Sequence, residues 1–321
     1  MKIGLDMMGG DFAPLEAVKG VAEYFVSSPA EVQLVLIGNE VKIKEHIASH
    51  PIAQDRYTII QASEVIEMNE HPTKALKEKK DSSIAIGFHL LATGKMDAFI
   101  SAGNTGAMMV GSLFSIKAIE GVLRPAIGAY LPREDGTLGL LVDVGLNADC
   151  KPENLNQFAM LGSLFARNIL NFEDPKVGLV NLGEEEGKGN LLAQATYSLL
   201  KENMEIHFVG NIEGRDILMT KADVLVCEGF TGNVVLKLAE SIYNIVKRRN
   251  IHDEHFDRFN FEQYGGVPVL GVSKPVIIGH GISHATAFKN MIRIAVRMLE
   301  TDLLGKMKKS FTETSQSTSS E

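Results

Sequence analysis

Short apolar runs alternate with longer amphipathic runs along most of this 321-residue chain, and this alternation limits its possible folds more than any other feature. The longer runs, such as PLEAVKGVAEYFV at 14–26, space their apolar residues as a helix does. Strands that alternate with helices form βαβ units, so the sequence predicts an α/β, Rossmann-like fold with a mostly parallel sheet and helices on both faces. The expected strands are KIGLD, VQLVLIG, YTIIQA, DAFISA, LGLLVDV, KVGLVNL, IHFVG, DVLVC and PVIIG.

Composition excludes several classes of protein. Lys plus Arg is 32 and Asp plus Glu is 40, so the net charge of −8 argues against a nucleic-acid binder. Two cysteines are too few for a disulfide scaffold, and no apolar run approaches the ~18 residues of a membrane span. We expect a cytoplasmic protein with one α/β domain over 1–309. The polar segment 310–321 is expected to be disordered.

The segment FISAGNTGAMMVGSL at 99–113 reads as a strand, a polar turn and a helix. The first N–H groups of a helix have no acceptor within the helix and lie at the positive end of its dipole, so such a turn suits an anion. Gly103 and Gly106 would let the backbone approach that anion closely. The alternative is that Asn104 or Thr105 only caps the helix.

Similar glycine-containing polar turns follow other predicted strands. They include DMMGGD at 6–11, DVGLN at 143–147, EGFTGN at 228–233 and GHG at 279–281. Ligands of such sheets bind at the carboxyl ends of the strands, so we expect these turns to line a cleft with backbone donors.

Two further segments place lysine near a predicted helix start. In KKDSS, Asp81 or Ser82 is a candidate cap, and Lys79 or Lys80 is a candidate phosphate contact, although the segment also reads as a solvated charge run. In NADCKPEN, Lys151 and Asn154 either contact substrate or cap the helix that begins at Pro152. The adjacent carboxylates of EEEG at 184–187 would point apart, and this disfavours a metal site. Cys227 reads as a small buried residue rather than a nucleophile.

Together, DMMGGDFAP, KKDSS, SAGNTGA, DVGLNADCKPEN, EEEGKGN, CEGFTGNVVLK, YGGVPVLGV and GHG resemble, in this order, the motifs of the bacterial phosphate acyltransferase (PlsX) family. The resemblance runs from residue 1 to about residue 300. It implies reversible transfer of a long-chain fatty acyl group from acyl carrier protein (ACP) to inorganic phosphate, without a cofactor, to give acyl phosphate for phospholipid synthesis. It also implies a fold related to phosphotransacetylases and isopropylmalate dehydrogenase-like enzymes, a homodimer, and a downstream glycerol-3-phosphate acyltransferase.

In such a reaction phosphate is itself the nucleophile, so the protein supplies position and charge stabilisation. We expect Lys80 and Lys151 to hold phosphate, Asn104 or Asn233 to stabilise the oxyanion, and His280 to protonate the leaving thiolate or to orient phosphate. The other expected substrate-binding residues are Asp6, Gly9, Gly10, Asp11, Ser82, Gly103, Thr105, Gly106, Asn147, Asn154, Gly229, Thr231 and Gly232. The sequence departs from the family motifs at Phe12, Leu146, Glu184, Ile282 and His284.

The segment NVVLKLAESIYNIVKRRN at 233–250 has an amphipathic helical pattern that ends in Lys247, Arg248 and Arg249. An acidic carrier protein would need such a basic surface. With Phe256, Phe259, Phe261 and Tyr264, the region 233–266 is expected to form a projecting helical arm. Dimerisation, carrier docking and peripheral membrane contact all stay open for this arm.

Three alternative functions remain at this stage. The first is a short-chain phosphotransacetylase that uses coenzyme A thioesters. The second is an NAD-linked hydroxyacid dehydrogenase, although no GxGxxG follows the first strand and the expected metal-binding aspartates are missing. The third is a non-enzymatic scaffold for lipid synthesis at the membrane.

Overall fold

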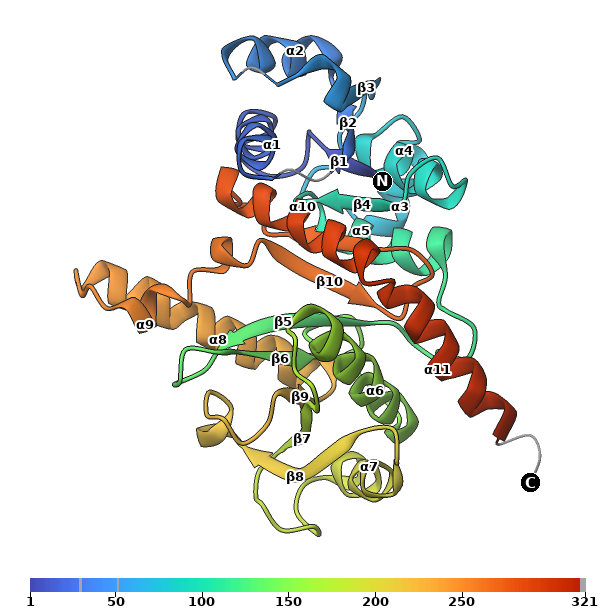
Figure 1. Cartoon of the computed structure of the whole chain (residues 1–321), viewed down its shortest axis with the longest axis vertical. Helices are drawn as coiled ribbons and strands as arrows, with labels where there is room; N and C mark the ends of the chain where they lie inside the picture. The colour runs from blue at the N-terminus through green and yellow to red at the C-terminus, as the bar shows by residue number, and fades with distance from the viewer. Residues whose placement is uncertain (29–30, 51, 318–321) are drawn as a thin grey trace. The chain divides into compact units, whose positions relative to one another are not determined.

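The computed structural model describes residues 1–28, 31–50 and 52–317, which form two compact units (Figure 1). Unit 1 consists of Met1–Ala118 and Phe261–Leu304, and unit 2 consists of Ile119–Asn260 and the chain from Gly305 onward. The division falls within the range 1–309 that the sequence analysis treats as one α/β domain. Its physical basis is that each unit has its own set of paired strands and its own buried apolar core.

Unit 1 carries six strands in the order β3-β2-β1-β4-β11-β10. All neighbours pair in parallel except β11 and β10, which are antiparallel. The strands are β1 (Lys2–Asp6), β2 (Gln33–Gly38), β3 (Tyr57–Gln61), β4 (Ala98–Ser101), β10 (Gly266–Leu270) and β11 (Val276–Gly279). The helices are α1 (Leu15–Ser27), α2 (Glu40–Ser49), α3 (Pro72–Glu78), α4 (Ser83–Ala92), α5 (Thr105–Gly111) with its π-helical continuation Ser112–Ile116, and α10 (Ala285–Glu300).

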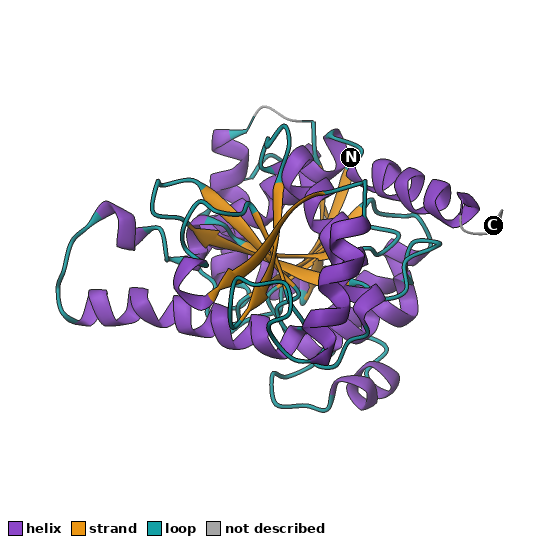
Figure 2. Cartoon of the chain, turned by 90° about the horizontal axis from the view of Figure 1, so that it is seen from below, coloured by secondary structure: helices purple, strands orange, loops and turns teal. Residues whose placement is uncertain are grey.

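Unit 2 carries five strands in the order β5-β6-β9-β7-β8, parallel except for β5 and β6. They are β5 (Ala126–Pro132), β6 (Leu138–Val142), β7 (Lys176–Asn181), β8 (His207–Glu213) and β9 (Val224–Val226). The helices are α6 (Pro152–Ile169), α7 (Leu191–Glu202), α8 (Gly229–Arg248) and α9 (Glu254–Asp257), while α11 (Leu303–Ser317) begins in unit 1 and continues into unit 2. Helices lie outside the strands in each unit (Figure 2).

These elements confirm the predicted mostly parallel α/β fold, and every strand expected from the sequence is present. Two strands were missed, β5 and β10. Each is antiparallel to its paired neighbour in its own unit, and β10 contains Pro268, a residue that disfavours a strand assignment.

The carboxyl-terminal region differs from expectation. Residues 310–317 continue α11 as helix instead of forming a disordered tail, whereas 318–321 lie outside the described residues. Leu303, Met307 and Phe311 are buried, and their spacing of four residues places them on one face of the helix. The apolar surface that these side chains bury stabilises α11 beyond the point where its sequence becomes polar.

Candidate functional site

In unit 1, three of the predicted turns lie at one edge of the sheet. Because β1 and β11 both pair in parallel with β4, the carboxyl ends of all three strands point the same way. The turns that begin after Asp6, Ser101 and Gly279 are therefore neighbours. The amide N–H of Asp11 donates to the carbonyl oxygen of Gly281 at 2.7 Å, which links the first turn to the third.

Asp6 organises the first two of these turns. Its carboxylate is buried and accepts from the Ser101 hydroxyl at 2.6 Å and from the Met8 N–H at 2.9 Å. The Ser101 hydroxyl oxygen in turn accepts from the Gly103 N–H at 2.9 Å. Burial raises the pKa of the Asp6 carboxyl, although hydrogen bonds from Ser101 and Ser83 oppose that shift. Asp6 thus acts within the protein as a fixed acceptor that sets the turn geometry.

Gly9 is required by this arrangement. A Cβ atom at that position would lie 2.5 Å from both a carboxylate oxygen of Asp6 and the amide nitrogen of Gly103. The adjacent Gly10 has a φ of +97°, which favours glycine. The glycines of the DMMGGD motif therefore allow the backbone after β1 to pack directly on the backbone after β4.

Asn104 caps α5, as the sequence predicts. Its side-chain oxygen accepts from the Ala107 N–H at 2.9 Å. Its side-chain amide donates to the carbonyl oxygens of Glu67 at 2.8 Å and Glu70 at 3.1 Å. Both ends of this buried side chain are thus occupied by the protein, and this disfavours Asn104 as the oxyanion donor. Thr105 and Gly106 form the first turn of α5.

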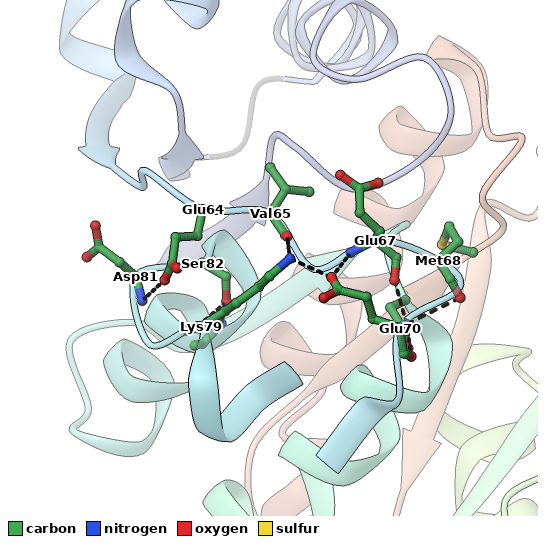
Figure 3. Close-up of polar contacts among 10 residues, drawn as sticks. Glu64, Val65, Glu67, Met68, Glu70, Lys79, Asp81 and Ser82 are labelled. Carbon is green, nitrogen blue, oxygen red and sulfur yellow. Dashed lines mark hydrogen bonds and ion pairs between the residues drawn. The ribbon is translucent and has the colours of Figure 1, made fainter. Parts of the chain in front are cut away.

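The two lysines of the KKDSS segment differ in their contacts, and Figure 3 shows those of Lys79. The ammonium group of Lys79 donates to the Val65 carbonyl at 2.7 Å and pairs with the Glu70 carboxylate at 2.6 Å. The Lys80 side chain is exposed and forms no ion pair or hydrogen bond with the residues that the structure describes. Ser82 is the N-cap of α4, as predicted, and its hydroxyl donates to the Lys79 carbonyl at 2.7 Å. Lys80 is therefore the lysine of this segment that is available to a ligand.

His280 follows β11 directly, at the sheet edge that carries the other two turns. Its ring lies 4.4 Å from the ring of Phe261, measured between centroids. Its carbonyl oxygen accepts from the Ser283 N–H at 3.0 Å. The aromatic contact limits the orientations that the imidazole can adopt.

In unit 2 a second buried aspartate, Asp143, organises the turn after its strand, as Asp6 does in unit 1. Asp143 follows β6 and accepts from the N–H groups of Ile127 at 2.9 Å, Leu146 at 3.3 Å and Asn147 at 2.7 Å, and from the Asn147 side-chain amide at 2.9 Å. Burial raises the pKa of this carboxyl as well, against the effect of those hydrogen bonds. One side chain thus makes three hydrogen bonds within the DVGLN turn and a fourth to β5.

The start of α8 packs directly on that turn. The Gly229 N–H donates to the Asn147 carbonyl at 2.7 Å, and the Asn233 side-chain amide donates to the Val144 carbonyl at 3.1 Å. A Cβ atom at Gly232 would lie 1.8 Å from the Asp143 carbonyl oxygen, so only glycine allows this contact. The structure therefore brings together the predicted residues Asn147, Gly229, Gly232 and Asn233.

The first turn of α8 is capped by Glu228, a role that we did not assign from the sequence. Its carboxylate accepts from the Thr231 N–H at 3.0 Å and from the Thr231 hydroxyl at 2.5 Å. Glutamate is not among the residues preferred at the N-cap position, so the sequence carried no strong signal for this role. The cap places a negative charge at a helix start that was expected to receive an anion.

Lys151 and Asn154 lie at the start of α6. The Asn154 side-chain oxygen accepts from the Lys151 N–H at 2.9 Å, and Asn154 is buried. Pro152 occupies the first helical position, as predicted. Asn154 therefore has the capping role, whereas the Lys151 side chain is exposed to solvent.

The cysteines are poor nucleophiles. Burial raises the pKa of the Cys150 thiol to about 11, and it raises that of the fully buried Cys227 thiol as well. The thiolate is the reactive form of cysteine, so neither residue is suited to covalent catalysis near neutral pH. Cys227 is the small buried residue that the sequence predicts.

The acidic loop after β7 is a set of ion pairs. Glu184 pairs with Lys221 at 2.8 Å, Glu186 with Lys201 at 2.9 Å, and Glu185 approaches Lys188 at 3.9 Å. Within residues 1–28, 31–50 and 52–317, no group of three His, Cys, Asp or Glu side chains is placed to hold a metal ion. Among the predicted site residues that the structure describes, Lys80, Lys151 and Asn233 expose a polar side chain to solvent.

Comparison with protein families gives one strong match. The chain matches the family described as fatty acid synthesis protein over residues 1–254 and 248–306. A phosphate acyltransferase of Dictyoglomus turgidum is 41% identical over 94% of this chain and 95% of the relative. A phosphate acyltransferase of Halothermothrix orenii is 43% identical over 96% of this chain and 98% of the relative.

Solved structures share the fold at lower identity. A phosphotransacetylase from Streptococcus pyogenes superposes with a TM-score of 0.65 at 17% identity, covering 93% of both chains. A branched-chain phosphotransacylase from Enterococcus faecalis gives a TM-score of 0.61 at 15% identity, covering 92% of this chain and 98% of the other. At this identity the likeness extends to the fold alone.

Proposed function

The chain belongs to the phosphate acyltransferase family and is an acyltransferase, and on that premise we propose that it reversibly transfers a long-chain fatty acyl group from ACP to inorganic phosphate. The observation that carries the proposal is the sequence similarity to phosphate acyltransferases, which extends over nearly the full length of the chain. Two turns at strand ends, each organised by a buried aspartate, support it. The product, acyl phosphate, would serve phospholipid synthesis through a glycerol-3-phosphate acyltransferase.

In the proposed reaction a phosphate oxygen attacks the thioester carbonyl carbon. A carbon–oxygen bond forms, the carbon–sulfur bond breaks, and the sulfur leaves with the electron pair and takes up a proton. The exposed ammonium group of Lys80 in unit 1, or that of Lys151 in unit 2, would hold the phosphate dianion, and backbone N–H groups would help to orient it. No residue of the protein has to form a covalent intermediate.

The contacts refine two of the expected roles. Both ends of the Asn104 side chain are bound within the protein, whereas Asn233 is exposed and uses one donor on Val144. We therefore favour Asn233 over Asn104 as the donor to the oxyanion. His280 remains the proposed acid for the leaving thiolate, whose ordinary pKa near ~8.5 calls for only modest assistance.

The reaction is tested by mixing the protein with palmitoyl-ACP and measuring carrier thiol release with and without phosphate, with hydroxylamine present to trap acyl phosphate. Phosphate-dependent release together with acyl hydroxamate would establish the transfer. Release from acetyl-coenzyme A but not from palmitoyl-ACP would instead select the short-chain phosphotransacetylase function. Unchanged kcat/KM in Lys151→Ala or His280→Ala would remove that residue from its role.

The end of α8 is the proposed docking surface for the acidic carrier. Lys247, Arg248 and Arg249 are all exposed there, in a chain whose net charge is −8. Complementary charge raises the association rate and gives specificity. Arg248→Glu is expected to raise KM for palmitoyl-ACP while leaving KM for palmitoyl-coenzyme A unchanged; equal effects on both donors would refute carrier docking at this surface.

Two aromatic side chains of the arm are covered by the protein to different degrees. Phe259 is buried and Phe256 is half-buried, so these aromatic side chains are not its exposed apolar surface. That surface lies instead on α8, where Phe230, Val234 and Leu238 are 67%, 54% and 67% exposed at a spacing of four residues. We propose that this stripe, defined by Phe230, Val234 and Leu238, forms the homodimer interface.

Leu238→Glu tests this assignment. We expect the variant to elute as a monomer while wild type elutes as a dimer, because a buried charge in an apolar interface is costly. No helix among the described residues is long and apolar enough to cross a membrane. We propose a cytoplasmic site of action with peripheral membrane contact, and loss of vesicle co-sedimentation in a still dimeric Leu238→Glu variant would assign the stripe to that contact instead.

A further inference from the structure

A cavity of about 320 Å³ lies within unit 2, beside the start of α8. Cys227, Glu228 and Thr231 line one side of it, and they belong to the turn on which the proposed reaction depends. Its volume falls in the range of small-molecule binding sites. The cavity therefore reaches Thr231, one of the predicted substrate-binding residues of α8.

Apolar side chains form most of the remaining wall. Leu155 of α6 and Leu179 of β7 are 2% and 1% exposed and close the inner side. Leu192 and Ala193 contribute from the first turn of α7. Leu182 also lines the cavity but is 73% exposed, so apolar surface runs from the interior out to solvent.

The polar groups of the wall are largely bound within the protein. The Asn181 side-chain oxygen accepts from the Leu182 N–H at 2.8 Å, and its amide donates to the Lys188 carbonyl at 3.1 Å and the Asn211 side chain at 3.0 Å. The Asn190 oxygen accepts from the Ala193 N–H at 2.8 Å. A polar ligand would find few free partners here, whereas a hydrocarbon would lose none.

The loop that carries Leu182 is held in place by these bonds. Asn211 donates to the Glu185 carbonyl at 2.9 Å, and Gln194 donates to the carbonyls of Gly187 and Gly189 at 3.0 and 3.1 Å. The apolar mouth is thus a fixed feature of the unit rather than a chance exposure of one side chain. A preformed pocket of this kind lowers the entropic cost of binding.

We propose that this cavity receives the hydrocarbon chain of the acyl donor and thereby selects long-chain over short-chain thioesters. The assignment rests on the proposed acyl transfer, because it gives the substrate of that reaction a binding site for its tail. The chain enters past the exposed Leu182, and Thr231 at the start of α8 is one of the polar residues of the wall.

The main test compares two substitutions on α7. Ala193→Trp fills the cavity, whereas Ala195→Trp adds the same side chain at an exposed position outside it. With palmitoyl-, octanoyl- and butanoyl-ACP as donors, Ala193→Trp should lower the ratio of kcat/KM for palmitoyl to butanoyl by about tenfold or more, because the lost contacts are those of the tail. Ala195→Trp should keep the wild-type ratio. An unchanged ratio, or an equal loss for all three donors, in a folded Ala193→Trp would overturn the assignment.

A second pair covers the case in which Ala193→Trp fails to fold. Leu192→Asn places an amide on the cavity wall, and Leu191→Asn changes the neighbouring leucine, which is 86% exposed and outside the wall. Binding of a dansyl-labelled fatty acid, followed by its fluorescence, needs no turnover. Loss of binding in Leu192→Asn alone supports the site, and equal binding in both variants refutes it. Wild type that binds the probe but consumes no thioester would refute the proposed transfer and with it the substrate assignment, and the probe binding would show that the cavity itself is intact.

Discussion

The ring of Phe12 stacks on the ring of His284, with centroids 4.6 Å apart and planes 16° from parallel. The pair joins the turn after β1 to the start of α10. His284 also lies 3.6 Å from the Glu16 carboxylate, and its N–H donates to Glu262 at 3.1 Å.

A double-mutant cycle measures this contact. We expect Phe12→Ala and His284→Ala each to lower the free energy of unfolding, with a coupling of about 0.5–1.5 kcal/mol between them, as is typical of aromatic pairs. Chemical denaturation of the four proteins gives this coupling. Strictly additive effects would show that the stack contributes no stability.

Asp143→Asn should destabilise unit 2 by about 2–3 kcal/mol, because an amide offers one acceptor oxygen where the carboxylate satisfies four donors. Thermal unfolding measures the loss. Activity should fall as well, since the same turn positions Gly229 and Asn233. A variant with wild-type stability would mean that the turn holds its shape without the charge.

Lys79 and Lys80 form a matched pair of adjacent lysines. Lys80→Ala should raise KM for phosphate by about tenfold, the effect of losing one hydrogen bond to a charged group, and leave the melting temperature unchanged. Lys79→Ala should lower the melting temperature instead, because it removes the contacts to Val65 and Glu70 (Figure 3). Phosphate titrations of both variants give KM, and melting curves give the melting temperature. A reversal of the two effects would assign the phosphate contact to Lys79.

Phe311→Ala tests the helical carboxyl-terminal segment. The side chain is 2% exposed, so its truncation should cost about 3 kcal/mol through lost burial and a residual cavity. Phe114→Ala serves as the control, because that ring is 74% exposed and its loss should change stability by less than about 0.5 kcal/mol. Equal stability of the two variants would mean that 310–317 contributes nothing to the fold.

Cys150 should react slowly with iodoacetamide. A pKa of about 11 in place of 9.0 lowers the thiolate fraction at neutral pH, and hence the alkylation rate, about a hundredfold. The same shift sets the pH dependence of the free energy of unfolding. Below pH 9 the thiol is protonated in both the folded and the unfolded state. As pH rises from 9 to 11 the thiol ionises first in the unfolded state, so the free energy of unfolding falls across that window. Alkylation followed by mass spectrometry gives the rate, and fast labelling at pH 7.5 would contradict the burial of Cys150.

The sequence by itself determined the fold class and the local features. Residues within a few positions of one another indicate every strand except β5 and β10, the helices α1, α6 and α7, the candidate caps Asn104 and Ser82, and the position of Pro152. Periodicity and capping are local properties, and a single sequence displays them directly. The family resemblance rests on the same local motifs, and the comparisons confirm it.

The tertiary structure decided which of those local groups remain available to a ligand. The side-chain amide of Asn104 donates to carbonyl oxygens 37 and 34 positions earlier in the chain. Lys79 forms an ion pair with Glu70, and Phe259 is buried in unit 2. The antiparallel strands β5 and β10, the burial of Phe311, and the cavity beside α8 likewise depend on residues distant in sequence. A sequence pattern reports what a residue is able to do, whereas packing between distant segments determines which of its hydrogen-bonding and apolar groups are already satisfied.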